Sequence, residues 1–211
     1  ELTTSRNPLR LTLDTDLQYL IREELLKSKD IFENLGSAAI LMNINNGDIL
    51  SMISLPDFDL NKRKKINDLK FINRATKGVY EFGSVFKTFT IAAGINYGVI
   101  KPETEFKNLK KRIVCAGNPI SEYDDKIPSD LKAEEILVRS GNIGSARIAE
   151  KIGIENYSKF LETIGILKNI DFDIAEVGET QMGRWGKCKL LTIGFGHGIA
   201  TTLLQLTKGY S

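Results

Sequence analysis

The sequence reads Tyr80-Glu81-Phe82-Gly83-Ser84-Val85-Phe86-Lys87-Thr88 at the start of an apolar segment that is closed by Gly98. Gly83 and Ser84 are predicted to begin a buried helix. Positions i and i+3 share one face of a helix, so the Ser84 hydroxyl should lie beside the Lys87 amine. A lysine held among apolar neighbours loses its preference for the charged form. As a free amine it can accept the serine proton, which makes the serine an acylating nucleophile.

A second polar segment, Ser140-Gly141-Asn142, follows farther along the chain between two expected helices. Glycine and asparagine are common where helices end, so one interpretation is a C-terminal cap. The other is a loop that presents a hydroxyl and an amide toward Ser84 and Lys87. Ser140 would then pass a proton from the lysine to a leaving amine, and Asn142 would hydrogen-bond the lysine and a substrate peptide bond. Because both motifs occur in this order, we favour the functional interpretation.

The elements around these motifs predict one hairpin followed mostly by helices. Before Ser84 we expect a short strand with Leu9, Leu11 and Leu13. A helix should follow, capped by Asp14 or Thr15, with one apolar stripe formed by Leu17, Leu20, Ile21 and Leu25. Next we expect a β-hairpin over 37–54 with a type I′ turn at Asn46-Gly47, and then a loop over 56–76. After it we expect a short strand at 111–115, helices at 133–139, 144–152 and 157–164, an irregular segment at 178–198, and a helix at 199–210. This order indicates the α+β class and a single domain over 1–211.

Composition excludes some classes of partner and site. The 211 residues are 42% hydrophobic and 27% charged with a net charge of +2, as expected for one globular domain with a core. The dense basic run at 62–65 is flanked by aspartates and is interpreted as a solvated loop, not a nucleic-acid site. No apolar run approaches the ~20 residues that span a bilayer. Cys115 and Cys188 fit neither a metal-ligand spacing nor a disulfide framework.

Several chemistries lack their residues. His197 is the only histidine and lies far from any Gly-x-Ser-x-Gly elbow, which disfavours a Ser-His-Asp triad. One histidine and two scattered cysteines do not suggest a zinc site. The glycines at 194, 196 and 198 lack dinucleotide-binding spacing and are interpreted as a tight turn in which backbone passes close to other backbone. Neither a metal nor a cofactor is expected.

The motifs resemble those of penicillin-binding transpeptidases, whose signature is Ser-x-x-Lys, then Ser-x-Asn, then Lys-Thr-Gly. The resemblance extends to residues 11–18, similar to the strand and first helix of that domain, to the hairpin at 44–52, and to 194–205 before its last strands. More narrowly, the chain resembles the class B, monofunctional type, above all the septal cell-division D,D-transpeptidase of Gram-negative bacteria. It departs from many relatives at Glu81-Phe82-Gly83, where they have Glu-Pro-Gly.

The resemblance implies a penicillin-binding/serine β-lactamase-like fold with an N-terminal hairpin and a helical subdomain. It also implies that Ser84 is the nucleophile, Lys87 the general base and Ser140 the proton shuttle, with Asn142 binding the lysine and the substrate. The implied substrates are peptidoglycan stem peptides ending in D-Ala-D-Ala, and β-lactam antibiotics would acylate the same serine. Proteins of the division complex are implied partners, without nucleic acid. The implied location is the periplasm, with an inner-membrane anchor outside this chain.

One motif of the family is missing, because neither Lys-Thr-Gly nor Lys-Ser-Gly occurs in the sequence. In the family this motif lies on a strand beyond the position of Ser211, so we expect a transpeptidase domain truncated before it, without the last sheet strands. Two alternatives remain open. A serine β-lactamase or D,D-carboxypeptidase would pass the acyl group to water. A non-catalytic interaction fragment would carry Ser84 and Lys87 without using them.

Overall fold

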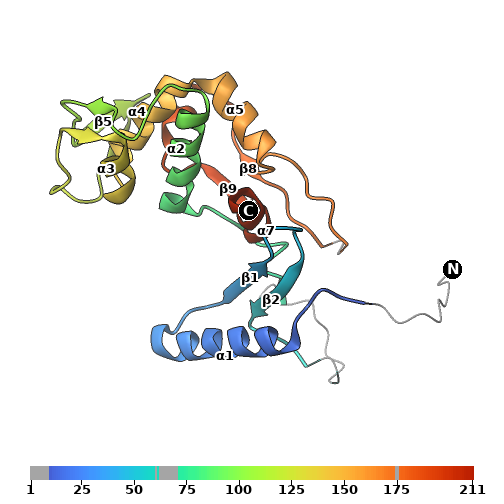
Figure 1. The fold of residues 1–211 in the computed structure, drawn as a ribbon. Coiled ribbons are helices and arrows are strands. Elements are labelled where there is room, and N and C mark those ends of the chain that lie inside the picture. Colours follow the sequence, from blue (N-terminus) through green and yellow to red (C-terminus); the bar gives the residue numbers. More distant parts are fainter. Residues whose placement is uncertain (1–9, 60, 62–70, 174–175) are drawn as a thin grey trace.

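The computed structural model describes residues 10–59, 61, 71–173 and 176–211, and Figure 1 shows two parts of unequal size. The smaller part contains helix α1 (Thr15–Phe32) and the antiparallel hairpin of β1 (Ser37–Met42) and β2 (Ile49–Leu55). The larger part contains β3 (Val79–Tyr80), the 3₁₀ helix η2 (Gly83–Phe86), α2 (Lys87–Asn96), β4 (Glu105–Phe106), β5 (Arg112–Cys115), β6 (Asn118–Ser121), β7 (Leu131–Lys132), α3 (Ala133–Val138), α4 (Asn142–Ile152), α5 (Ile154–Thr163), β8 (Gln181–Met182), α6 (Lys187–Ile193), β9 (Ile199–Thr202) and α7 (Leu203–Tyr210). α7 lies against β1 and links the two parts. The predicted α+β class is confirmed.

Helix α1 begins at the predicted cap and packs on the hairpin. The Asp14 carboxylate accepts hydrogen bonds from the first N–H groups of the helix. Gln18 then fixes the helix to β2, because its amide donates to the Met52 carbonyl and accepts from the Met52 N–H. The predicted apolar stripe is only partly correct, since no residue of α1 is buried and Leu20 is 56% exposed.

The hairpin is confirmed, but its turn and the strand predicted before α1 are not. Residues 43–48 form a longer turn, in which the Gly47 N–H donates to the Asn43 carbonyl at 2.8 Å. A type I′ turn needs positive φ at both central residues, and here Gly47 has it (79°) while Asn46 does not. The Asn43 and Asn46 side chains accept backbone N–H bonds within the turn and so stabilise the longer form. Residues 10–13 form no strand, and Leu9 lies outside the described residues.

Helix α4 is the centre of the larger part and packs against α2, α5 and α6. Its buried side chains include Ile148, Ala149 and Ile152. The predicted helices at 133–139, 144–152 and 157–164 are all present as α3, α4 and α5, with ends that differ by a few residues. The predicted strand at 111–115 is β5.

Two predictions near the C-terminus were wrong. The segment 178–198 is not irregular throughout, because it contains β8 and α6, and the expected helix at 199–210 is a strand, β9, followed by α7. β9 lies between β3 and β8 in a three-stranded sheet, which holds its residues in an extended form. Thr202 ends the strand because its side chain caps α7 in a reciprocal pair with Gln205.

The interpretation of the cysteines was also wrong. Cys115, at the end of β5, forms a disulfide with Cys188 in the first turn of α6. Their Cα atoms are 5.5 Å apart although 73 residues separate them in sequence. Spacing along the chain carries no information about such a pair, because only the folded α4–α6 packing brings the hairpin and the helix together.

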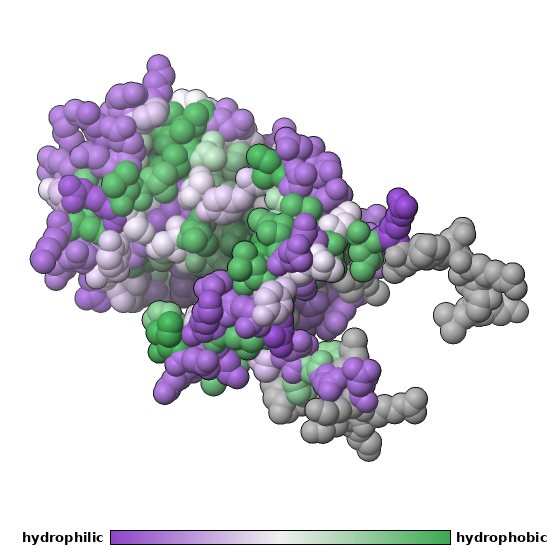
Figure 2. Space-filling view, turned by 60° about the horizontal axis from the view of Figure 1, so that its bottom comes forward, coloured by the Kyte–Doolittle hydropathy of each residue, from purple (hydrophilic) through white to green (hydrophobic). Residues whose placement is uncertain are grey.

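Exposed hydrophobic side chains gather around the smaller part and in a hollow of the larger part, where Figure 2 shows green patches between hydrophilic rims. On and beside α1 these exposed side chains include Leu20, Ile31, Phe32 and Leu35. Within the described residues, no helix is both long and apolar enough to cross a bilayer. The same residues contain no group of three or more His, Cys, Asp or Glu that could hold a metal ion. The basic run at 62–65 lies outside them.

Candidate active site

The Ser84 hydroxyl and the Lys87 amine lie side by side at the junction of η2 and α2. The sequence predicts one helix from Gly83, but the first turn is 3₁₀ and Lys87 is the first α-helical residue. This turn leaves Ser84 exposed while Lys87 is fully buried. The distance between Lys87 Nζ and Ser84 Oγ is 3.1 Å. The Ser84 hydroxyl, which a substrate can reach, therefore contacts the Lys87 amine, which is shielded from water.

Lys87 Nζ lies within hydrogen-bond distance of three further oxygens among the described residues. They are the Ser140 carbonyl oxygen at 2.5 Å, Ser140 Oγ at 2.9 Å and Asn142 Oδ1 at 2.8 Å. A neutral amine can donate two hydrogen bonds and accept one. It can donate to the carbonyl and to the amide oxygen and still present its lone pair to a hydroxyl. The structure thus brings together all four residues that the sequence singled out.

Burial sets the protonation of this amine. Desolvation lowers the pKa of Lys87 from 10.5 to about 8, and the nearby Glu122 carboxylate partly opposes this change. Near neutral pH a substantial minority of molecules therefore carry the free base that deprotonation of Ser84 requires. The cause is the burial of the amine away from water, which the sequence indicated.

The segment 140–142 satisfies both of its interpretations. It ends α3, because the Ser140 N–H donates to the Leu137 carbonyl and the Gly141 N–H to the Ile136 carbonyl. It also presents Ser140 to Lys87, with Ser140 in the left-handed region at a φ of 53°. Non-glycine residues adopt this conformation rarely, and such positions cluster at functional sites. Asn142 is then the first residue of α4, not part of a loop.

Glu122 is a site residue that the sequence did not reveal. Its two carboxylate oxygens accept the backbone N–H groups of Asn142 (2.6 Å) and Ile143 (2.9 Å) at the start of α4. The preceding residue, Ser121, accepts the Asn142 side-chain amide at 2.9 Å. An acidic group stabilises a helix N-terminus, but here it comes from a distant hairpin, so no local pattern marks it.

The glycine turn at 194–198 passes close to other backbone, as predicted, and the structure shows that this backbone is Gly83, beside the nucleophile. A Cβ built on Gly196 would lie 1.9 Å from the Gly83 carbonyl oxygen, and Gly196 has a φ of 82°. Glu81 holds the same turn, because its carboxylate accepts the Gly198 N–H at 2.9 Å and lies 3.1 Å from His197 Nδ1. His197 is thus paired with Glu81, whereas the side chain that contacts Ser84 Oγ is Lys87.

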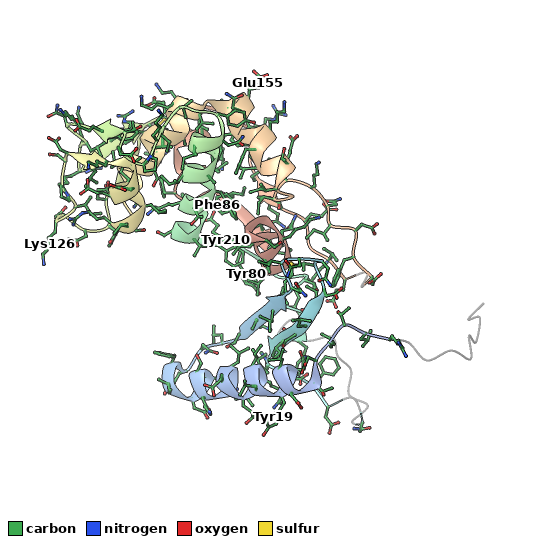
Figure 3. The ribbon with its side chains drawn as sticks, in the orientation of Figure 1. Tyr19, Tyr80, Phe86, Lys126, Glu155 and Tyr210 are labelled. Carbon is green, nitrogen blue, oxygen red and sulfur yellow. A yellow bond between two sulfur atoms is a disulfide. The ribbon has the colours of Figure 1, made fainter. Side chains whose placement is uncertain are left out.

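An aromatic cluster supports the nucleophile from the other side. Figure 3 shows Phe86 and Tyr210 close together where α2 meets α7. The Phe86 and Phe89 rings are 5.1 Å apart, and the Phe89 and Tyr210 rings 4.8 Å apart. The Tyr210 hydroxyl donates to the Val85 carbonyl, next to Ser84. Packing from α7 therefore fixes the turn that carries the serine.

Comparison with known proteins identifies the family of this chain. The family described as the penicillin binding protein transpeptidase domain matches residues 37–211. The probable peptidoglycan D,D-transpeptidase FtsI of Caulobacter vibrioides is 31% identical over 95% of this chain, and peptidoglycan D,D-transpeptidase FtsI of Escherichia coli K12 is 27% identical over 96%. The chain spans 34% of the length of each of these relatives.

Solved structures agree on the fold. The TP domain of penicillin-binding protein 3 from Burkholderia pseudomallei superposes with a TM-score of 0.82, at 22% identity over 97% of this chain and 58% of that one. The predicted penicillin-binding fold is therefore confirmed. Since the family match covers most of the sequence and includes both motifs, the chain belongs to the penicillin binding protein transpeptidase domain family.

Proposed function

We propose that this protein is a peptidoglycan D,D-transpeptidase of the class B, septal type, which forms an acyl-enzyme on Ser84. One observation carries the proposal: an exposed serine contacts a fully buried lysine amine, which Ser140 and Asn142 hold by three further oxygens. This is the arrangement that serine acylation without a histidine requires. The D,D-transpeptidase names of the relatives agree with it.

In the proposed reaction, neutral Lys87 takes the Ser84 proton as Oγ attacks the carbonyl of the penultimate D-alanine of a stem peptide. The Ser84 N–H and the N-terminal end of the helix favour the negative charge that develops on the carbonyl oxygen. Collapse of the tetrahedral intermediate breaks the bond to the terminal D-alanine, whose amine receives its proton from Lys87 through Ser140. The amine of a second stem peptide then attacks the ester and gives a proton to Lys87, the cross-link forms, and Lys87 returns a proton to Ser84 Oγ as the serine leaves.

Asn142 has two parts in this proposal. Its Oδ1 accepts from Lys87, and its amide donates one hydrogen to the Ser121 carbonyl, which leaves the second for a substrate peptide bond. β-Lactams imitate the D-Ala-D-Ala end and would acylate Ser84 in the same way. No metal or cofactor takes part in these steps.

We also propose that the domain works in the periplasm, attached to the inner membrane by an anchor outside this chain, together with proteins of the division complex. The Cys115–Cys188 disulfide supports the location, because disulfides persist in the bacterial periplasm and are rare in the cytosol. The relatives named FtsI support the septal role.

Labelling with fluorescent penicillin tests the activity and separates it from its alternatives. The wild-type protein should take up one label that survives gel electrophoresis. The Ser84→Ala variant should take up none, while Ser158→Ala, a change at a half-buried serine of α5, should behave like the wild type. Loss of the label within seconds would indicate a β-lactamase instead. Absence of label from a folded wild-type protein would favour the non-catalytic alternative.

With an acyl-D-Ala thioester, whose thiol leaves in place of the terminal D-alanine, and an added D-amino acid, a transpeptidase should form the transfer product. A D,D-carboxypeptidase would release only the hydrolysed acid. Exclusive hydrolysis at saturating acceptor would therefore refute the proposed transfer reaction.

A further inference from the structure

The β5–β6 hairpin is attached to the rest of the protein in an unusual way. Within the described residues it pairs with no other strand, and an isolated two-stranded hairpin is marginally stable in water. Ile120 is its one buried side chain and packs against Ile143 of α4 and Leu191 of α6. The disulfide from Cys115 also links the hairpin covalently to α6.

The end of this hairpin holds the residues around Lys87. Ser121, the last residue of β6, accepts the Asn142 side-chain amide, and Glu122 accepts the Asn142 and Ile143 N–H groups. Glu122 is itself tied to the base of the hairpin, because its N–H donates to the Lys111 carbonyl at 3.0 Å. A shift of the hairpin would therefore pull three hydrogen bonds away from the start of α4.

From there the connection to the amine is direct. Asn142 Oδ1 accepts from Lys87 Nζ at 2.8 Å, and Ser140, two residues earlier, supplies a carbonyl and a hydroxyl to the same nitrogen. Ser140 has an unfavourable left-handed φ of 53°. Such a conformation persists only where its surroundings fix it, and the nearest fixed point on its C-terminal side is Asn142.

We propose that the Cys115–Cys188 disulfide and Glu122 act together as a positioning device for Lys87. The disulfide fixes the hairpin against α6, and Glu122 transmits that position to the start of α4. Both cysteines are half-buried and line a cavity of about 600 Å³ together with Lys189 and His197, so a small thiol can reach the bond. The consequence for acylation rests on the proposed function, but the effect on the start of α4 does not.

Amide hydrogen exchange tests the structural step without any catalysis. The oxidised protein is compared with a Cys115→Ser/Cys188→Ser double variant. Exchange at the N–H groups of Asn142 and Ile143 should become about tenfold faster or more, as expected when a hydrogen bond to a charged group is weakened. Amides of α5 should keep their exchange rates. Unchanged exchange at both amides, or an equal increase in all helices, would overturn the proposal.

A double-mutant cycle tests the connection through Glu122. The covalent rate constant and the half-saturating concentration for penicillin acylation are measured with and without the disulfide, in the wild type and in Glu122→Gln. Removing the disulfide should slow the covalent step about tenfold in the wild type and much less in Glu122→Gln, because the carboxylate that transmits the position is then absent. The half-saturating concentration should barely change.

Glu134→Gln is the matched control, since Glu134 is exposed in the first turn of α3 and leaves the start of α4 intact. In this variant the disulfide should have its full wild-type effect. Dithiothreitol reduces the disulfide of the wild type, and its own two thiols are oxidised to a disulfide as the two cysteines are released. The reduced protein should acylate as slowly as the double cysteine variant. Reoxidation should restore the wild-type rate. Independent, multiplying effects of the disulfide and Glu122 would refute the coupling. If no form is acylated, the proposed function fails and hydrogen exchange still decides the positioning proposal.

Discussion

Titration of Lys87 should occur near pH 8, not near the ordinary lysine value. Burial lowers its pKa from 10.5 to about 8. That difference corresponds to roughly 3 kcal/mol in favour of the neutral amine, and at pH 7 it raises the neutral fraction from about one in three thousand to about one in ten. The rate of Ser84 acylation should therefore rise about tenfold per pH unit below pH 8 and level off above it.

The same change in pKa links pH to stability. The unfolded chain holds the lysine proton up to about pH 10.4, whereas the folded protein releases it near pH 8. Between these values the unfolded state binds more protons, so folding becomes more favourable as pH rises, by ~1.4 kcal/mol per pH unit. Below about pH 8 the cost of burying the charged lysine is constant. The difference in unfolding free energy between the wild type and Lys87→Ala should show this slope and then level off above pH 10.

Two measurements give the titration midpoint of Lys87 directly. NMR of the Lys87 side chain labelled with ¹³C reports the titration, and the acylation rate of wild-type protein should follow the same curve. Glu122→Gln should lower the midpoint, because the carboxylate raises the pKa of Lys87. A Lys87 midpoint near 10.5, or an acylation rate that does not change between pH 6 and 8, would refute the assignment of Lys87 as a free base made available by burial.

Two further changes test how the fold holds the site. Gly196→Ala should destabilise the protein by about 3 kcal/mol or more in urea denaturation and slow acylation, because the new methyl group would overlap the Gly83 carbonyl and Gly196 has a positive φ. The control Gly186→Ala should cost less than ~1 kcal/mol, because φ is −175° there and no atom lies within 4 Å of the new methyl group. Equal costs for the two variants would contradict the close approach of Gly196 to Gly83. Tyr157→Phe removes a fully buried hydroxyl that contacts Thr90 at 2.6 Å, and it should lower the free energy of unfolding by about 1 kcal/mol. The acylation rate should not change, because Thr90 Oγ1 keeps its hydrogen bond to the Gly194 carbonyl. A large fall in the acylation rate would show that this hydrogen-bond network reaches the nucleophile.

Local patterns predicted the parts of the molecule whose causes are local. Asp14 begins α1 because its side chain satisfies nearby N–H groups, and Ser84 and Lys87 meet because they are one turn apart. The glycine turn was interpretable from sequence because only glycine permits such a close backbone approach. These features need no knowledge of what packs against them.

The features that sequence reasoning missed depend on tertiary packing. β9 is extended because β3 and β8 lie on both sides of it, although its residues also fit a helix that continues into α7. The disulfide joins segments that only the packing of α4 on α6 brings together. Glu122 reaches the start of α4 from a hairpin twenty residues earlier, and no periodic pattern records such a contact.

The most direct test of the site is the location and rate of the acyl group. Protein treated with benzylpenicillin is digested, and mass spectrometry identifies the modified residue in the wild type and in Lys87→Ala. The adduct should lie on Ser84, and the variant should acylate at least about a hundredfold more slowly, as expected when a general base is lost. An adduct at another residue, or equal rates in the two proteins, would contradict the assignment of Ser84 and Lys87 as nucleophile and base.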